Sequence, residues 1–150
     1  MAVTVRIRIM EDIRKLISQP DNKKQVADLV ISQMKTSIAS GLSPVRGIGR
    51  FVEYKNPAKY PGDRKAKRPV NLYLTGEMLG ALNFYPTSGP NVSIGIRGTL
   101  GKIAKYNNDG TEHVPRRHFM PTNEGEEYTV TITRSIRDLY ARLVSDKLSR

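Results

Sequence analysis

Two histidines and nearby carboxylates are the residues whose types could support metal binding or acid–base chemistry. His113 and His118 stand five residues apart, with Asp109 and Glu112 close to them in the chain. A zinc site needs three or four ligands and hydrogen bonds that orient them, and this spacing matches no established ligand pattern. We therefore predict structural or surface roles for both histidines, and no metal or other cofactor.

A second group of possible metal ligands is acidic. Glu124, Glu126 and Glu127 have the ligand type of a calcium site, but the alternating Asp/Asn pattern of a calcium-binding loop is missing. Acidic residues near the start of a helix complement the helix dipole. We expect that role for this acidic group, ahead of the C-terminal helix.

Sequence signatures of catalytic sites are missing. The chain has no cysteine, which excludes thiol nucleophiles, disulfides and thiolate metal sites. No serine stands in a Gly-x-Ser-x-Gly turn, and Gly47 and Gly49 lack the third glycine of a dinucleotide-binding loop. Gly98 and Gly101 match the Gly-x-x-Gly clamp of one RNA-binding module, but the flanking segments do not fit that module, and a plain turn is predicted there. We expect no catalytic residue and no enzymatic activity.

The charge of the chain is its most informative overall property. The 150 residues include 25 Lys or Arg against 14 Asp or Glu, which gives a net charge of +11. Such an excess indicates an anionic partner, either nucleic acid or an acidic protein surface. The apolar runs, such as residues 27–31, are far shorter than the ~18 residues of a membrane-spanning helix, so no membrane partner is expected.

More than half of this charge lies in one predicted loop. Between residues 41 and 69 hydrophobic periodicity vanishes while glycine and proline accumulate. Against two acidic residues, the basic residues of this loop are Arg46, Arg50, Lys55, Lys59, Arg64, Lys65, Lys67 and Arg68. Phe51, Tyr54 and Tyr60 are interleaved with them, which favours nucleic-acid contact because cations meet phosphates and rings stack on bases. A solvated loop, or one that docks on an acidic protein neighbour, is the alternative.

Before this loop the sequence predicts one strand and two helices. Apolar residues alternate over 3–9, as in a half-buried strand, and residues 11–18 have helical spacing up to a break at Gln19–Pro20. A second helix is expected with Asp21 as its N-cap and Gly41 at its end. Its apolar stripe consists of Val26, Leu29, Val30, Met34 and Ile38.

After the loop the sequence predicts short elements and a final helix. Thr75 is expected to cap a short helix, residues 83–85 and 92–96 to pair as strands, and residues 102–107 to form a brief helix stopped by the turn cluster 107–110. A C-terminal helix is expected from about Arg134, whereas residues 127–133 fit either a strand or the start of that helix. Its apolar stripe consists of Ile132, Ile136, Leu139, Tyr140, Leu143 and Leu148.

These elements predict an α+β fold in a single domain over residues 1–150. A small antiparallel sheet packs against one long and one C-terminal helix, and an extended basic loop covers about residues 41–69. The chain length is in the commonest range for one domain, and no internal repeat or domain boundary is visible. Phe51, Val52 and Tyr54 are a candidate short strand inside the loop.

Three segments of the second half, taken in order, resemble a family of phage proteins. They are Leu74-Thr75-Gly76-Glu77-Met78-Leu79, then Ala104-Lys105-Tyr106-Asn107-Asn108-Asp109-Gly110, then Val114-Pro115-Arg116-Arg117-His118-Phe119-Met120. As an ordered set over roughly residues 70–148 they are similar to the tail-completion or head–tail joining proteins of tailed bacteriophages, the virion-morphogenesis family of the Mu gpG and lambda gpZ type.

The residues of these motifs are expected to pack rather than react. Gly76 and Gly110 stand where turns need freedom in φ, Pro115 stiffens the chain before Arg117, and Phe119 anchors the segment to the core. Leu74 and Thr75 open the first motif. Arg117 is expected to hold its loop through backbone carbonyls or a carboxylate, within one subunit or between two.

The resemblance implies a structural virion protein that forms a ring at the phage neck and joins the head connector to the tail. It also implies a hexamer made in the host cytoplasm, with the connector or adaptor, the tail terminator or the tail tube as neighbours, and DNA in the channel as a further contact of the basic loop. Two alternatives stay open: a tail terminator that caps the tail tube, and a stand-alone DNA-binding protein that uses the basic loop.

Overall fold

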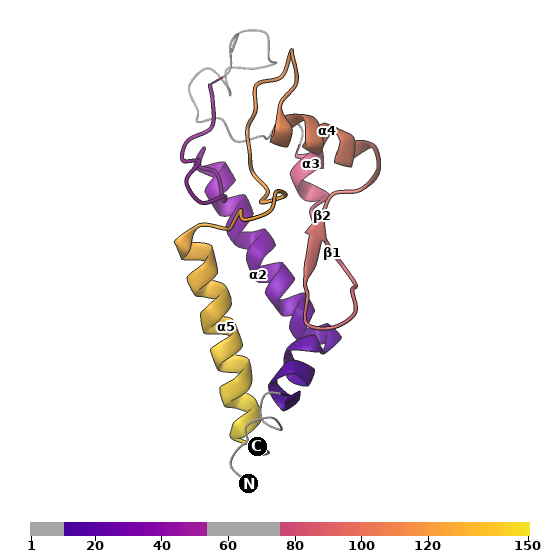
Figure 1. Cartoon of the computed structure of the whole chain (residues 1–150), viewed down its shortest axis with the longest axis vertical. Coiled ribbons are helices and arrows are strands. Elements are labelled where there is room, and N and C mark those ends of the chain that lie inside the picture. The colour runs from indigo at the N-terminus through magenta and orange to yellow at the C-terminus, as the bar shows by residue number, and fades with distance from the viewer. Residues whose placement is uncertain (1–10, 54–75) are drawn as a thin grey trace.

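Two long helices form the body of the molecule. The computed structural model describes residues 11–53 and 76–150. α2 (Pro20–Ala39) and α5 (Val130–Leu148) lie side by side along the long axis (Figure 1). Gln33 of α2 donates a 2.7 Å hydrogen bond from Nε2 to Ser135 Oγ of α5. The predicted strand at 3–9 lies outside the described residues.

α2 begins two residues earlier than the sequence predicted. Residues 11–18 are helical, and the predicted break follows because Gln19 is extended, with φ −62° and ψ 135°. Pro20 then occupies the first helical position, where its missing N–H would have no helical partner. Gln19 is therefore the N-cap, and the prediction that Asp21 caps the helix is wrong; Asp21 lies in the first turn.

The apolar stripe of α2 is confirmed as the centre of the core. Val26, Val30, Met34 and Ile38 are at most 4% exposed, and Leu29 is partly buried beside them. Residues three and four apart share one face of a helix, so this stripe meets α5 and the sheet together. The buried core residues are Val26, Val30, Met34, Ile38, Phe51, Met78, Leu79, Leu82, Ala104, Phe119, Ile132 and Leu139.

A two-stranded antiparallel sheet packs on α2. β1 (Asn83–Tyr85) pairs with β2 (Ser93–Gly95), with Phe84 opposite Ile94. The connecting turn is tied to α2 by Lys23, which is 2% exposed and donates from Nζ to the carbonyl oxygens of Thr87 (2.6 Å) and Gly89 (2.9 Å). The predicted strand pair and the α+β class are confirmed.

Two shorter helices pack against each other at the upper end of Figure 1. α3 (Glu77–Gly80) has Gly76 as its N-cap, with φ 81°, so the prediction of a Thr75 cap is wrong, and Thr75 itself lies outside the described residues. Met78, Leu79 and Leu82 are buried, as predicted.

α4 (Gly98–Asp109) is longer than the predicted helix at 102–107. It takes in the segment that was predicted to be a plain turn and the first three residues of the predicted turn cluster. Two glycines within four residues lower helix propensity, but packing of α4 against α3 overrides it. Gly101 is needed at the helix start because a Cβ there would lie 2.5 Å from the Ile96 carbonyl oxygen.

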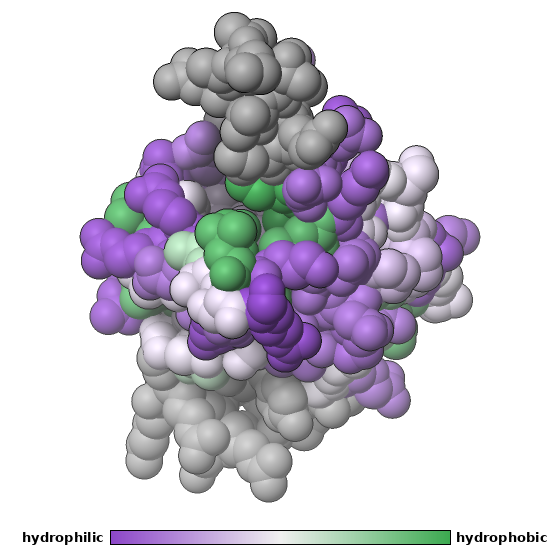
Figure 2. Space-filling view, turned by 90° about the horizontal axis from the view of Figure 1, so that it is seen from below, coloured by the Kyte–Doolittle hydropathy of each residue, from purple (hydrophilic) through white to green (hydrophobic). Residues whose placement is uncertain are grey.

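Residues 127–133 were predicted to form either a strand or the start of the C-terminal helix, and most of them belong to the helix. Tyr128 forms an isolated antiparallel bridge with Val45, and the helix begins at Val130. Ile132 and Leu139 are buried as predicted, but Leu148 is 79% exposed, so its predicted inward position is wrong. Leu148 lines a groove between residues 11–18 and the end of α5. Figure 2 shows apolar residues gathered at this lower end of the molecule, surrounded by hydrophilic ones.

The described part of the predicted basic loop, residues 41–53, is fixed to the body. Leu42 and Arg50 form an isolated bridge, and Phe51 is buried in the core. Residues 51–53 form no strand, so the candidate strand there is wrong over these residues. Phe51 instead packs its ring in the core, although the backbone around it pairs with no strand.

Candidate functional site

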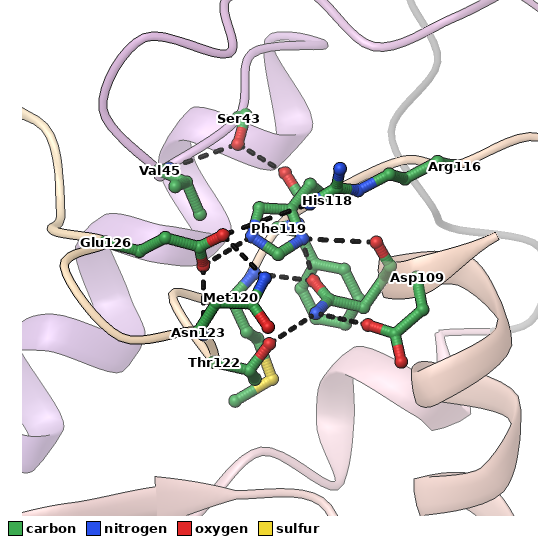
Figure 3. A network of polar contacts seen from close by, with 11 residues as sticks. Ser43, Val45, Asp109, Arg116, His118, Phe119, Met120, Thr122, Asn123 and Glu126 are labelled. Carbon is green, nitrogen blue, oxygen red and sulfur yellow. Dashed lines mark hydrogen bonds and ion pairs between the residues drawn. The ribbon is translucent and has the colours of Figure 1, made fainter.

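A buried polar network holds the segment between α4 and α5, residues 110–129, which we call the connecting segment. Figure 3 shows its side chains converging on His118 from the end of α4, from the connecting segment itself and from the loop after α2. Ser43 of that loop donates from Oγ to the His118 carbonyl oxygen and accepts from the Val45 backbone N–H. Three parts of the chain that are distant in sequence are therefore joined at one point.

Asn108, near the end of α4, is the centre of this network. Its side chain is 3% exposed, and Oδ1 accepts hydrogen bonds from the backbone N–H groups of Phe119 and Met120, both at 2.9 Å. Its Nδ2 donates to Thr122 Oγ1 at 3.1 Å. Buried backbone N–H groups are costly without a partner, so Asn108 makes this turn of the connecting segment possible.

His118 and Glu126 form a short, partly buried contact. Nδ1 of His118 lies 3.1 Å from the Asn108 carbonyl oxygen, which can only accept, so Nδ1 carries a hydrogen. Nε2 lies 2.6 Å from Glu126 Oε2, and this contact needs a second proton between the two groups. Hydrogen bonds from Asn123, and then from His118, hold the pKa of Glu126 at about 2.

We expect this pair to make the stability of the protein depend on pH. The pKa of Glu126 is lower in the folded chain, about 2, than its ordinary 4.5. A carboxyl group of this kind contributes stability above its unfolded pKa and loses the contribution as the pH falls through its folded pKa. The contribution should therefore be complete at neutral pH and disappear between about pH 4.5 and 2.

Urea unfolding of the native chain and of Glu126→Gln measures this effect. The native chain should have the higher midpoint at neutral pH, and the difference should close as the pH approaches 2. Glu124→Gln, an exposed carboxyl two residues away, is the matched control and should leave the midpoint unchanged at both pH values. A Glu126→Gln difference that stays constant over this range would contradict the assignment.

Arg117 connects the connecting segment to the base of the basic loop. The residue is 6% exposed, and its guanidinium donates from Nε to the Val52 carbonyl oxygen at 2.9 Å and from Nη2 to the Glu53 carbonyl oxygen at 3.3 Å. The expectation of contact with backbone carbonyls is confirmed, and the contact lies within one chain. Glu53 is the last described residue before position 54, so this clamp fixes the described end of the predicted basic loop.

A second anchor holds an earlier part of the same loop. The Arg46 backbone N–H donates to the Glu127 carbonyl oxygen, and the Thr129 N–H donates to the Pro44 carbonyl oxygen, both at 2.9 Å. The side chains of Arg46 and Glu127 form an exposed ion pair. Exposed ion pairs contribute little, so the backbone pairing is the stronger part of this anchor.

The other motif residues in the described part of the chain surround these anchors. Gly110 ends α4 with φ 78° and ψ 162°, and Gly76 is the N-cap of α3 with φ 81°, so the prediction that both stand where the backbone needs freedom in φ is confirmed. Phe119 is fully buried, as expected of a core anchor, and Pro115 is partly buried two residues before Arg117. Leu74 lies outside the described residues.

The basic residues predicted to contact a partner are only partly described. Arg46 and Arg50 are exposed on the loop before position 54. The six basic residues from Lys55 to Arg68 lie outside the described residues, so their contact role stays a prediction.

The acidic residues before α5 do not have the role that was predicted. The first turn of α5 contains no acidic residue, so the dipole explanation is wrong. Glu126 instead pairs with His118 and accepts from Asn123, while Glu127 pairs with Arg46. The sequence offered no sign of these two ion pairs, because the fold brings His118 to Glu126 and Arg46 to Glu127.

The two histidines lie in different surroundings. His113 is exposed at a turn whose Thr111 Oγ1 accepts from its backbone N–H, whereas His118 is 2% exposed. Over residues 11–53 and 76–150, no three His, Asp or Glu side chains gather as a metal site would require. Within those same ranges, no helix has the length and apolar character needed to cross a membrane.

Comparison with protein-family models, curated proteins and solved structures finds no match to this chain. A functional proposal therefore depends on the residues and contacts of this chain alone.

Proposed function

We propose that this chain is a structural virion protein that forms a ring at the neck of a tailed bacteriophage and joins the head connector to the tail. The observation that carries the proposal is the Arg117 clamp on the Val52 and Glu53 carbonyl oxygens. Arg117 belongs to the third motif of the resemblance, and its buried guanidinium holds the base of the basic loop. This is the arrangement of a scaffold that presents a surface rather than of a reaction centre.

The shape and charge of the molecule support the same role. The described segments on either side of residues 54–75 lie at the end of the molecule that carries α3 and α4. The helix α5 ends at the opposite end (Figure 1). A ring subunit needs two unlike ends for two unlike neighbours, and a repeated heterologous contact that closes. The basic loop would meet a neighbouring ring or DNA in the channel, and the proposed neighbours are the connector or adaptor, the tail terminator and the tail tube.

Charge reversal in the basic loop tests this function. We expect Arg64→Glu, Lys65→Glu, Lys67→Glu and Arg68→Glu, combined in the full-length chain, to leave folding intact and to abolish joining of heads to tails in an assembly assay. Lys35→Glu, Lys102→Glu, Arg134→Glu and Arg142→Glu make the same change in charge on exposed positions of α2, α4 and α5 and are the matched control. Normal joining with the loop variant would contradict the proposal.

A free DNA-binding protein is the second candidate, because the net charge of +11 also suits a phosphate backbone. The isolated chain would then bind duplex DNA with an affinity that falls steeply with salt, and the loop variant would lose that binding. Electron cryomicroscopy of the neck separates these candidates from each other and from the tail terminator. A closed ring of this chain between connector and tail supports the joining function, and a ring on the tail tube supports the terminator. Absence of the chain from virions supports the free DNA-binding protein.

A further inference from the structure

A short hairpin follows α2 and has an apolar tip. It covers residues 41–52, and the Ser43 backbone N–H closes it by donating to the Gly49 carbonyl oxygen at 2.8 Å. Leu42 and Arg50 face each other across it in an isolated antiparallel bridge. In Figure 1 it lies at the upper end of α2, on the other side of the molecule from α4. We call it the 41–52 hairpin.

One side of the 41–52 hairpin is fixed in the body. Ser43, Val45 and Phe51 are at most 6% exposed. Val45 forms a bridge with Tyr128, just before α5, and the Ser43 hydroxyl donates to the His118 carbonyl oxygen. Because these contacts hold the hairpin in one shape, a partner meets a pre-formed surface and little conformational entropy is lost on binding.

The opposite side of the hairpin exposes apolar side chains. Leu42 is 40% exposed, Ile48 42% and Val52 54%. Side chains alternate along extended backbone, so Leu42 and Val52 point away from the buried Ser43 and Phe51. The described part of the chain has seven exposed large hydrophobic side chains, and three of them belong to these twelve residues. Apolar side chains gathered in this way mark a site of protein contact.

Two glycines hold Ile48 at the tip of the hairpin. Gly47 and Gly49 have φ values of 85° and 74°, which other residues rarely adopt. A Cβ added to either would meet nothing within 4 Å, so the backbone conformation, and not packing, requires glycine there. The isoleucine between them is thereby kept in an exposed turn, where its side chain is available to a partner.

The charge beside the tip fits an acidic protein. Within residues 11–53 and 76–150, Arg50 forms no ion pair, whereas Arg46 pairs with Glu127. Arginine beside apolar side chains is typical of protein–protein interfaces. DNA contacts proteins mostly through phosphate and sugar, which would leave the apolar side chains of this surface unmatched. An apolar pocket with a carboxylate on its rim matches both the apolar tip and the unpaired guanidinium.

We propose that the tip of the 41–52 hairpin docks into an apolar pocket with an acidic rim on a neighbouring protein of the neck. Ile48 enters the pocket, Leu42 and Val52 cover its border, and Arg50 pairs with a carboxylate on the rim. The inference names the surface through which the chain holds its neighbour, and it rests on the proposed function.

Binding of the purified chain to heads and tails tests the contact. The probes are heads and tails purified from a phage mutant that lacks this chain, and co-sedimentation of the labelled chain gives the dissociation constant. Ile48→Asp should weaken binding about 10- to 100-fold, as expected for losing a buried apolar side chain. Ile103→Asp is the matched control, because Ile103 on α4 has almost the same exposed fraction, 43%, and it should leave binding unchanged. Equal effects of the two variants would overturn the proposal.

Two further variants keep the test independent of folding and examine the charge. Ile48→Ala removes the apolar contact without adding a charge and should weaken binding about tenfold while the urea midpoint stays that of the native chain. Arg50→Glu should weaken binding at least about tenfold, because it brings like charges together, whereas Arg50→Lys should keep most of the affinity. Native affinity in Ile48→Ala and Arg50→Glu would overturn the proposal.

Other occupants of the hairpin give different results. If DNA is the occupant, Ile48→Asp and Arg50→Glu both weaken binding of the chain to a duplex oligonucleotide and leave binding to heads and tails unchanged. If a second copy is the occupant, Ile48→Asp dissociates an oligomer of the purified chain and again leaves binding to heads and tails unchanged. Either result would overturn the proposal.

Failure of the contact and failure of the function are distinguishable. If the native chain binds neither heads nor tails, the neck function is wrong and the docking proposal falls with it. If the native chain binds and Ile48→Asp binds equally well, the docking surface alone is wrong.

Discussion

Replacing Phe119 with alanine is expected to lower the free energy of unfolding by about 3–5 kcal/mol, the range for truncating a buried aromatic side chain. Phe119 is fully buried and is among the largest such side chains in the described chain, so its removal leaves a cavity that the two long helices cannot close. For a chain of this length the loss corresponds to a fall in Tm of roughly 10 °C. Differential scanning calorimetry and urea unfolding measure the two quantities.

Leu148→Ala is the control for Phe119→Ala. Leu148 is 79% exposed, so its truncation should change the free energy of unfolding by no more than about 0.5 kcal/mol. Phe119→Leu keeps much of the buried volume and should fall between the two. A loss below about 1 kcal/mol for Phe119→Ala would show that the connecting segment is not anchored through this ring.

Replacing Gly110 with alanine is the second change with a large expected effect, about 3 kcal/mol of lost stability. The backbone of Gly110 has φ 78° and ψ 162°, a region that essentially only glycine occupies and that costs other residues about 1–3 kcal/mol. A Cβ would also lie 2.9 Å from the backbone nitrogen and 3.0 Å from the Cα of Arg116. The clash is with backbone, so it can be relieved only by shifting the chain that carries Arg117.

A second glycine separates the two causes of this loss. Gly89 also has positive φ, 69°, but an added Cβ there would meet nothing within 4 Å. Gly89→Ala should therefore cost only the backbone strain, about 1–2 kcal/mol. Urea unfolding compares the variants, and equal losses at both positions would show that the contact with Arg116 is unimportant.

Local patterns in the sequence correctly predicted the elements whose structure depends on residues close together in the chain. The stripe of α2 is visible because residues three and four apart share a helix face, and the β1–β2 pair is visible because turn residues separate two apolar runs. The burial of Phe119 and the need for freedom in φ at Gly110 were expected from the residue types and their places in the motifs. In each case the deciding information lies within a few residues.

The network around His118 could not be predicted in the same way. Asn108 stands in a run of residues that usually form turns, and its function at the end of α4 depends on backbone groups eleven and twelve positions later. Lys23 has the spacing of a solvated helix face, yet it is buried because the turn between β1 and β2 covers it. Such positions depend on tertiary contacts, which composition and periodicity do not encode.

The two ends of the stretch between Glu53 and Gly76 are fixed independently, one by the Arg117 clamp and the other by the first turn of α3. Insertions or deletions between them would leave both attachment points unchanged, because each is held by contacts outside that stretch. We therefore expect changes of length in this stretch to be tolerated far better than changes of length in α2 or α5.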